Sequence, residues 1–229
     1  MRIIRVEHGG TSYYGILEDG LVFRLHQQPG HMEPIPLSEA KVLPLVTPSK
    51  VVCVGLNYKA HAEELGYPLP NMPSFFLKPP SSIIGNGEPI VLPSGMGRIE
   101  HEAELAMVVG KVCRNLTPEE AEESLFGFTC ANDVTAREVQ KVDPLIGHCK
   151  SYDTFCPIGP WIETELEDIN DLSIRCLVNG EVRQSANTGD MIFRPLDLLC
   201  FLSRVMTLMP GDVILTGTPP GISPIQADD

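Results

Sequence analysis

The sequence is short of basic residues and of long apolar runs. Its 17 Lys and Arg stand against 30 Asp and Glu, which gives a formal net charge of −13 at pH 7. This balance argues against a nucleic-acid partner, because binding to phosphates needs clustered positive charge. No stretch approaches the ~20 apolar residues of a membrane span, and the first ten residues contain no apolar signal-peptide core. We therefore expect a cytoplasmic protein with no membrane partner.

Disulfide and zinc-site patterns are also missing. The seven cysteines are dispersed and odd in number, and no two of them form a Cys-x-x-Cys pair. Reduced, buried thiols are the simplest interpretation. The loop at 217–221 lacks the Gly-Lys-Ser/Thr ending of a phosphate-binding loop, so its Gly and Pro content indicates a turn.

Strand signals outnumber helix signals, and no βαβ alternation is present. Asp19-Gly20 and Asn179-Gly180 each lie between two apolar runs, which is typical of β-hairpins. The pattern predicts an α+β protein that is mostly β and mostly antiparallel. We place a boundary near residue 48, between a small N-terminal β domain (residues 1–47) and a main domain (residues 48–229).

A few helices have clear start signals. Two capping boxes, at 117–120 and 135–138, predict helix starts. Asn57 is expected to cap a helix over residues 58–65 that Gly66 ends, and apolar residues at helical spacing predict a helix over 195–208.

Three carboxylates are the strongest functional signal. Glu102 and Glu104 alternate with apolar residues in a predicted strand, so both project from one face, roughly 6–7 Å apart. Two like charges on one face repel unless a cation or solvent separates them. Asp133, which follows the strand expected at 126–131, would complete an all-oxygen site for a hard divalent ion. An isolated Glu-x-Glu pair is more often a solvated edge strand, and strand parity turns His101 away from both glutamates.

Six segments, in this order, resemble the fumarylacetoacetate hydrolase family. They are VGLNYKAHAEELG, FFLKPPSSIIG, IEHEAELAMVVGK, GFTCANDVTAREVQ, KSYDTFCPIGP and PGDVILTGTPPGI, and they extend from about residue 50 to residue 225. The resemblance is to the acylpyruvase and 2-hydroxyhepta-2,4-diene-1,7-dioate isomerase branch. It implies a mixed β-roll catalytic domain that holds Mg²⁺ or Mn²⁺, and it implies a homodimer.

The same resemblance implies roles for nine residues. They are the metal ligands Glu102, Glu104 and Asp133, the substrate-binding residues Arg137, Gln140 and Thr218, and the catalytic residues Lys150, His61 and Glu64. Taken singly, several have a plainer interpretation. A His and a Glu three apart on a helix are most often a solvated surface pair, and Lys150 alone would be read as an exposed lysine. The role of Lys78 stays open.

The chemistry of these residue types fits a 2-oxo acid substrate. A β-dicarbonyl with a 2-oxo acid end can chelate a metal held by carboxylates, and cleavage of its carbon–carbon bond expels an enolate that the metal stabilises. A lysine ammonium adds positive charge there, and His61 oriented by Glu64 can activate water. The leading hypothesis is therefore hydrolysis of an acylpyruvate-type diketo acid. The alternatives are oxaloacetate decarboxylation, isomerisation or decarboxylation of an unsaturated 2-hydroxy dicarboxylate, and a non-catalytic 2-oxo acid binding protein.

Two further expectations concern the C-terminal end of the chain and the segment that carries the His–Glu pair. Members of this family usually continue with a hairpin after the 217–221 loop, so the C-terminal end reads as truncated, and the strand at 212–216 would then be an edge open to association. The segment from 58 to 77 combines the His–Glu pair with several prolines. We expect it to be mobile without ligand and to close over a bound 2-oxo acid.

Overall fold

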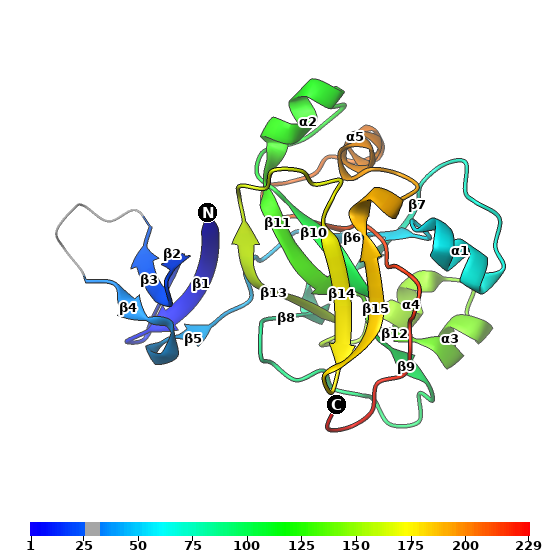
Figure 1. Ribbon diagram of the computed structural model, residues 1–229, viewed down its shortest axis with the longest axis horizontal. Helices are drawn as coiled ribbons and strands as arrows, with labels where there is room; N and C mark the ends of the chain where they lie inside the picture. The colour runs from blue at the N-terminus through cyan, green and yellow to red at the C-terminus, as the bar shows by residue number, and fades with distance from the viewer. Residues whose placement is uncertain (26–32) are drawn as a thin grey trace.

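The computed structural model describes residues 1–25 and 33–229; residues 26–32, which belong to the predicted N-terminal domain, lie outside the described residues. In the described part, a long mixed sheet has the strand order β4-β3-β2-β1-β13-β11-β10-β16-β6-β7, with β5 added beside β1 and β8 beside β13 (Figure 1). The strands are β1 (Arg2–His8), β2 (Thr11–Glu18), β3 (Leu21–Arg24), β4 (Ile35–Pro36), β5 (Lys41–Val42), β6 (Val51–Gly55), β7 (Ser74–Lys78), β8 (Ile83–Ile84), β9 (Ile99–Glu100), β10 (Ala103–Val109), β11 (Leu125–Asn132), β12 (Thr135–Ala136), β13 (Cys156–Glu163), β14 (Ser173–Val178), β15 (Glu181–Asn187) and β16 (Val213–Leu215).

The α-helices are short and peripheral. They are α1 (Lys59–Leu65), α2 (Pro118–Ser124), α3 (Arg137–Val142), α4 (Ile146–Lys150) and α5 (Pro195–Val205). The prediction of an α+β, mostly β protein is confirmed, and most pairings are antiparallel, with parallel pairs only at β6–β16 and β8–β13 among the described strands. Among the same residues, no helix is long and apolar enough to cross a membrane.

The N-terminal strands extend one side of the long sheet, and Ile3 and Ile16 pack into the same apolar cluster as Ile162. Figure 1 shows β1 to β5 beside the larger roll, and β1 reaches it by pairing with β13 at Arg2↔Glu163 and Ile3↔Ile162. Both hairpins are present where Asp19-Gly20 and Asn179-Gly180 predict them.

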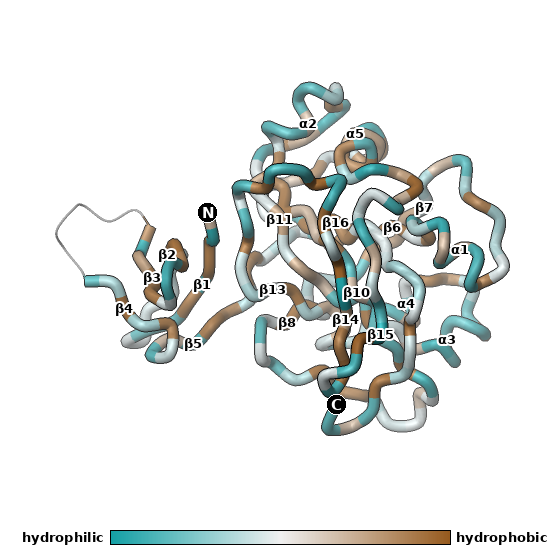
Figure 2. Tube along the Cα trace, in the orientation of Figure 1, coloured by the Kyte–Doolittle hydropathy of each residue, from teal (hydrophilic) through white to brown (hydrophobic). Residues whose placement is uncertain are grey.

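Alternation along β10 gives each face of the central sheet its own core. Ala106 and Val108 pack into one apolar cluster, whereas Met107 and Val109 pack into a second cluster beneath α5. The strand interiors are accordingly the most hydrophobic parts of the chain trace (Figure 2). Because both faces of β10 are buried, any charged group on this strand lies in a desolvated setting.

Three local expectations are wrong. β16 is not an edge, because it pairs with β10 on one side and β6 on the other. Asn57 does not cap α1; its side chain donates to the carbonyls of Phe193 and Thr216 and so holds two other segments. The Thr135 hydroxyl caps no helix either; the oxygens within hydrogen-bond distance of it are the Asp133 carbonyl at 2.9 Å and Glu102 Oε1 at 3.2 Å.

Candidate metal and substrate site

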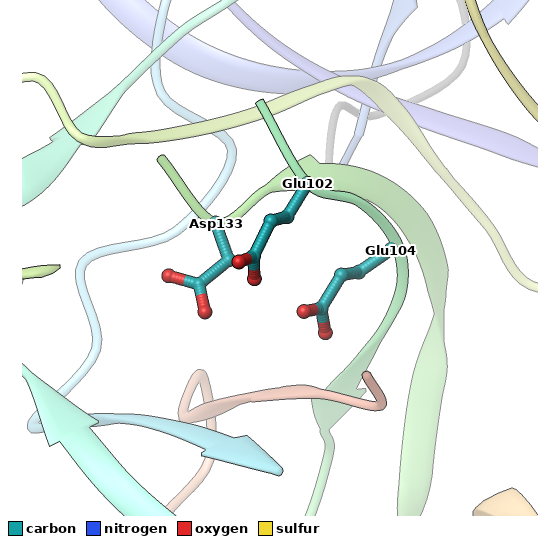
Figure 3. A group of neighbouring side chains, drawn as sticks. All are labelled: Glu102, Glu104 and Asp133. Atoms are coloured by element: carbon teal, nitrogen blue, oxygen red, sulfur yellow. The ribbon is translucent and has the colours of Figure 1, made fainter. Parts of the chain in front are cut away.

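The three predicted carboxylates lie together in the interior. Glu102 and Glu104 flank the start of β10, and Asp133 follows β11, the antiparallel neighbour of β10. One oxygen from each residue lies within 4.8 Å of the other two, and their side chains converge in Figure 3. The residues are only 5%, 2% and 1% exposed, respectively. Strand parity predicted that Glu102 and Glu104 share a face, the family resemblance added Asp133, and the solvated-edge interpretation is wrong.

Two buried lysines neutralise part of this charge. Lys150, at the end of α4, donates to Glu102 Oε2 at 2.7 Å and to Asp133 Oδ2 at 2.5 Å. Lys78, at the end of β7, donates to Asp133 Oδ1 at 2.6 Å and to the Val134 carbonyl. Burial opposes ionisation of Glu102, but Lys150 and Arg137 outweigh it and lower the pKa of Glu102 to about 2. The same carboxylates raise the pKa of Lys150 despite its burial.

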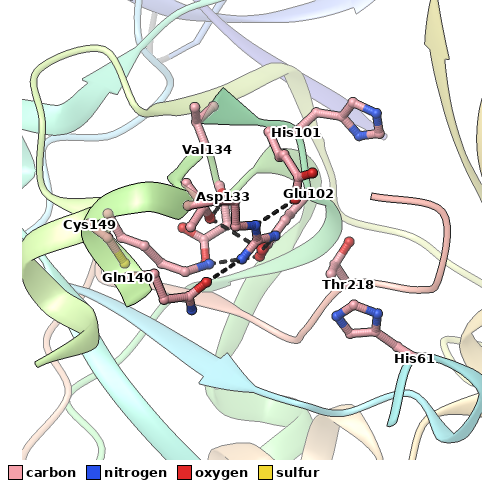
Figure 4. A network of polar contacts seen from close by, with 12 residues as sticks. His61, His101, Glu102, Asp133, Val134, Gln140, Cys149 and Thr218 are labelled. Carbon is pink, nitrogen blue, oxygen red and sulfur yellow. Dashed lines mark hydrogen bonds and ion pairs between the residues drawn. The ribbon is translucent and has the colours of Figure 1, made fainter. Parts of the chain in front are cut away.

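Arg137 links the cluster to a carboxylate outside the triad. Its guanidinium donates to Glu100 Oε2 at 2.5 Å, to Gln140 Oε1 at 2.9 Å and to Glu102 Oε1 (Figure 4). Glu100 is 1% exposed and also accepts from Arg98. The residues Glu100, Glu102 and Glu104 recur every second position, so the alternation that identified two of them could also have identified the third.

Glu104 has the least satisfied carboxylate of the triad. Among the described residues, its hydrogen bond comes from the Gly217 N–H, to Oε2 at 2.5 Å. Burial raises the pKa of Glu104 well above its usual range, and the negative charges of Asp133 and Glu102 raise it further, although Lys150 and Gly217 act in the opposite direction. Three desolvated carboxylates with one lacking a cation partner are a donor set that suits a hard divalent ion.

The predicted His–Glu pair is assembled at the same cavity. His61 Nδ1 and Glu64 Oε2 lie 2.8 Å apart on α1, and Glu64 Oε1 accepts from the Gly221 N–H at 3.1 Å. His61 is 6% exposed and Glu64 has a 37% exposed side chain, so the pair joins a buried imidazole to a carboxylate at the surface. Its ring faces the cluster from the side on which Thr218 lies (Figure 4).

The Thr218 hydroxyl is held by groups of the chain itself. It donates to the Ala103 carbonyl at 2.9 Å and accepts from Gln184 Nε2 at 2.8 Å. Gln184 also accepts from His101 and from the Ala103 N–H, so this buried glutamine fixes the loop beside the site. His101 points away from the triad, as strand parity predicts.

One cavity of about 270 Å³ is lined by seven of the nine predicted residues. The other two, Glu64 and Asp133, are bonded to the lining residues His61 and Lys150. The lining residues that carry polar chemistry are His61, Glu102, Glu104, Arg137, Gln140, Lys150 and Thr218. Sequence reasoning left Lys78 open and missed Glu100 and Gln184, because each acts through another residue; Glu100 has the every-second-residue spacing of the two predicted glutamates, whereas Lys78 and Gln184 have no recognisable spacing to their partners.

Comparison with known proteins identifies the family. Residues 50–228 match the model of the fumarylacetoacetate (FAA) hydrolase C-terminal domain, and residues 1–44 match an Rv2993c-like N-terminal domain. The chain therefore belongs to the fumarylacetoacetate hydrolase family.

Individual relatives differ in what their names say they do. A 5-carboxymethyl-2-hydroxymuconate delta-isomerase from Mycobacterium smegmatis is 41% identical with a TM-score of 0.89, over 98% of this chain and 90% of that one. A maleylpyruvate hydrolase from Sphingobium sp. SYK-6, solved with manganese(II) and pyruvate, is 32% identical with a TM-score of 0.82, over 98% and 91%. The human mitochondrial oxaloacetate tautomerase FAHD2A is 45% identical over 82% of this chain, which spans 62% of that protein's length. Family membership thus indicates an enzyme that acts on a small molecule and leaves the specific reaction open.

Proposed function

We propose that this protein is a hydrolase that cleaves a carbon–carbon bond in an acylpyruvate-type 2-oxo diketo acid and uses Mg²⁺ or Mn²⁺ held by Glu102, Glu104 and Asp133. The observation that carries the proposal is the buried triad close to the His61–Glu64 pair, with Glu102, Glu104 and His61 lining one cavity. Support also comes from the manganese and pyruvate bound to the related maleylpyruvate hydrolase.

The chain's own residues supply the proton chemistry. Glu64 accepts from His61 Nδ1, which leaves Nε2 free of a proton and able to take one from water. The water oxygen bonds to the 4-carbonyl carbon, the bond between carbons 3 and 4 breaks, and carbon 3 takes up a proton, so the products are a carboxylic acid and pyruvate. A bound divalent ion supplies Lewis-acid stabilisation of the negative charge that develops on the 2-oxo oxygen.

The cationic residues hold the substrate's acid end. Lys150 and Arg137 already bond to carboxylates of the cluster, so each places positive charge beside the ion site without leaving its own partner. Gln140, held by Arg137, offers its amide N–H₂ to a ligand oxygen.

A second candidate function is proton transfer or decarboxylation without hydrolysis. It is supported by relatives named as an isomerase and as an oxaloacetate tautomerase, and it would use His61 to move a proton on the substrate carbon. A non-catalytic binding role is a weaker hypothesis, because a protein that only binds has no need of an oriented His–Glu pair.

The deciding assay follows the diketo-acid absorbance together with its products, with Mg²⁺ or Mn²⁺ present and after EDTA treatment. Hydrolysis yields equal amounts of pyruvate and free acid, and His61→Gln, which cannot act as a base, abolishes it. Release of CO₂ alone, or a shifted double bond alone, would contradict the hydrolase proposal. Full activity in EDTA would contradict the metal.

Two predictions about the assembly stay as proposals. We propose a homodimer, now on family membership alone, since β16 offers no free edge. We also propose closure of residues 58–77 over the ligand, although His61 already faces the cavity. A monomer by light scattering would remove the first. Equal hydrogen exchange over 58–77 with and without oxalate and Mg²⁺ would remove the second.

A further inference from the structure

Glu100 is a buried carboxylate to which the proposed reaction gives no task. It is 1% exposed, lies two positions before Glu102, and is not one of the residues that line the cavity. Its Oε1 accepts from Arg98, and its Oε2 accepts from Arg137 Nε at 2.5 Å. Burial of a carboxylate costs free energy, and a buried ion pair often adds little to stability. Stability alone therefore does not account for the contact with Arg137.

The backbone fixes the position of Arg137 without help from the Glu100 side chain. β9 and β12 pair with Glu100 opposite Thr135, and the Arg137 N–H, at the start of α3, donates to the Arg98 carbonyl at 2.8 Å. Main-chain hydrogen bonds therefore hold the backbone end of Arg137 against β9. What the Glu100 carboxylate adds is a contact with the guanidinium, at the other end of the side chain.

The Arg137 guanidinium is shared among three acceptors. Its Nε donates to Glu100, its Nη1 to Gln140 at 2.9 Å, and its Nη2 to Glu102 (Figure 4). A guanidinium has five N–H groups, so one N–H on each terminal nitrogen is left without an acceptor in the described part of the chain. Arg137 lines the cavity, and its side chain is 14% exposed. Two N–H groups are thus available to a carboxylate of a ligand.

The two carboxylates that bond to Arg137 act on different nitrogens of the guanidinium. Glu100 bonds to Nε, the nitrogen nearest the backbone, and Glu102 bonds to Nη2. A guanidinium with a single carboxylate partner favours a two-bond contact with it. Without Glu100, the guanidinium would be drawn into such a contact with Glu102, and an N–H group that a ligand needs would be used up. The contact with Glu100 opposes this turn.

We propose that Glu100 is a positioning residue that acts through Arg137: it holds the guanidinium so that two N–H groups remain available in the cavity for the acid group of the ligand. This inference rests on the proposed function for the placement of that acid group beside the metal. It does not depend on whether the bound acid is then hydrolysed, isomerised or decarboxylated.

Calorimetry with oxalate on the Mg²⁺-loaded protein tests the proposal, with Glu100→Met as the variant because it removes both acceptor oxygens from a side chain of similar length. The Kd of oxalate should rise at least about tenfold, the effect of losing a charge-assisted hydrogen bond. The Kd of Mg²⁺ alone should change less than about threefold, because the three carboxylates of the triad are untouched. An unchanged Kd of oxalate, or an equal loss of oxalate and Mg²⁺ affinity, would overturn the proposal.

Glu138→Met is the matched control. Glu138 is the neighbour of Arg137 in the sequence, but its side chain is 48% exposed and is bonded to Lys141. The same substitution there should leave both Kd values unchanged. An equal rise in the Kd of oxalate in Glu138→Met and Glu100→Met would show that any lost negative charge near Arg137 has this effect, and it would contradict a positioning role for Glu100.

A double-mutant cycle shows whether Glu100 acts through Arg137, and it also serves if Glu100→Met does not fold. Glu100→Gln keeps the shape of the side chain but offers one acceptor oxygen to two arginines, so the Kd of oxalate should rise by a smaller factor, about fivefold. In an Arg137→Lys background, whose ammonium cannot form a two-bond contact with an acid group, the same substitution should have no further effect. An equal factor in both backgrounds would overturn the proposal.

Turnover of an acylpyruvate-type diketo acid tests the proposed function separately. Where the acid is cleaved, Glu100→Met should raise KM more than it lowers kcat, because the acid group is bound in the ground state and in the transition state alike. If no diketo acid is cleaved while Glu100→Met still weakens oxalate binding and spares Mg²⁺ binding, the hydrolase proposal fails and the positioning inference stands. If a diketo acid is cleaved and Glu100→Met leaves both KM and the Kd of oxalate unchanged, the hydrolase proposal stands and the positioning inference fails.

Discussion

The ladder between β10 and β16 has a buried carboxylate at each end, and the two carboxylates have opposite surroundings. Asp212, just before β16, accepts hydrogen bonds from the Ser49 N–H and hydroxyl, from the Lys50 N–H and ammonium, and from the Met209 N–H. Glu104, on β10, is bonded by the Gly217 N–H alone within the described chain. Both side chains are almost fully buried.

Burial alone therefore does not tell a structural carboxylate from a binding one. Burial disfavours the charged form of Asp212, but its donors lower its pKa all the same. Burial and two neighbouring carboxylates raise the pKa of Glu104. A chain that satisfies a carboxylate gains stability from it, whereas a chain that leaves it unsatisfied gives up stability for a ligand.

The largest expected effect comes from Glu104→Gln, which keeps an acceptor for the Gly217 N–H but removes the charge. Metal assistance is worth several kcal/mol, so kcat/KM should fall at least about a thousandfold. The metal-free variant should unfold at a higher temperature than the natural protein, because a repelled buried charge is gone. Metal content, steady-state kinetics and calorimetric melting check this. Normal metal affinity in the variant would show that Glu104 is not a ligand.

Asp212→Asn should lower stability and leave metal binding intact, the opposite of what we expect for Glu104→Gln. It replaces a carboxylate that five donors satisfy and leaves the Lys50 ammonium without its charged partner. Hydrogen bonds to charged groups contribute about 1.5–3 kcal/mol, so the free energy of unfolding should fall by about 3 kcal/mol, as measured in urea. The folded variant should keep its metal affinity. A loss of metal binding at full stability would break the contrast between the two ends of the ladder.

In the metal-free protein the two carboxylates should give pH dependences of opposite sign. Because the pKa of Asp212 is lowered, its stabilisation is complete above the unfolded value and is lost as pH falls through the folded one. The gap in stability between the natural protein and Asp212→Asn should thus close in acid. Because the pKa of Glu104 is raised, its protonated form is favoured, and stability is lost as pH rises through the folded value.

The gap between the natural protein and Glu104→Gln should accordingly open as pH rises, with the variant the more stable of the two. Each unit of pKa difference is worth about 1.4 kcal/mol. Urea unfolding of all three proteins in EDTA, across the acidic and neutral range, measures both gaps. Gaps that change in the same direction would contradict the opposite environments.

Local periodicity in the sequence was enough to predict side-chain directions on β10 and the position of a hairpin. Alternation placed Glu102 and Glu104 on one face and turned His101 away, and Asp19-Gly20 located a hairpin. What the sequence could not supply is competition between partners that lie far apart in the chain. Thr135 has the spacing of a helix cap, yet its hydroxyl bonds to Glu102, 33 residues away. Lys78 and Gln184 act in the same way, each through a contact that only the folded chain creates.

The smallest expected effect concerns a buried, uncharged polar group that has no hydrogen-bond partner among the described residues. The Thr129 hydroxyl, on β11, is enclosed and has no hydrogen-bond partner among the described residues, so Thr129→Val should raise the free energy of unfolding by about 1 kcal/mol, since an unsatisfied hydroxyl is replaced by a methyl of similar shape. Thr188→Val is the matched control, because that equally buried hydroxyl donates to the Ile169 carbonyl and accepts from the Leu172 N–H. The control should lose about 1–2 kcal/mol, since it removes both hydrogen bonds of that hydroxyl and leaves two part-buried backbone groups unpaired. If both variants lose the same stability in urea, the Thr129 hydroxyl is satisfied in solution, by an enclosed water for example, and the rule drawn from Asp212 and Glu104 does not extend to neutral groups.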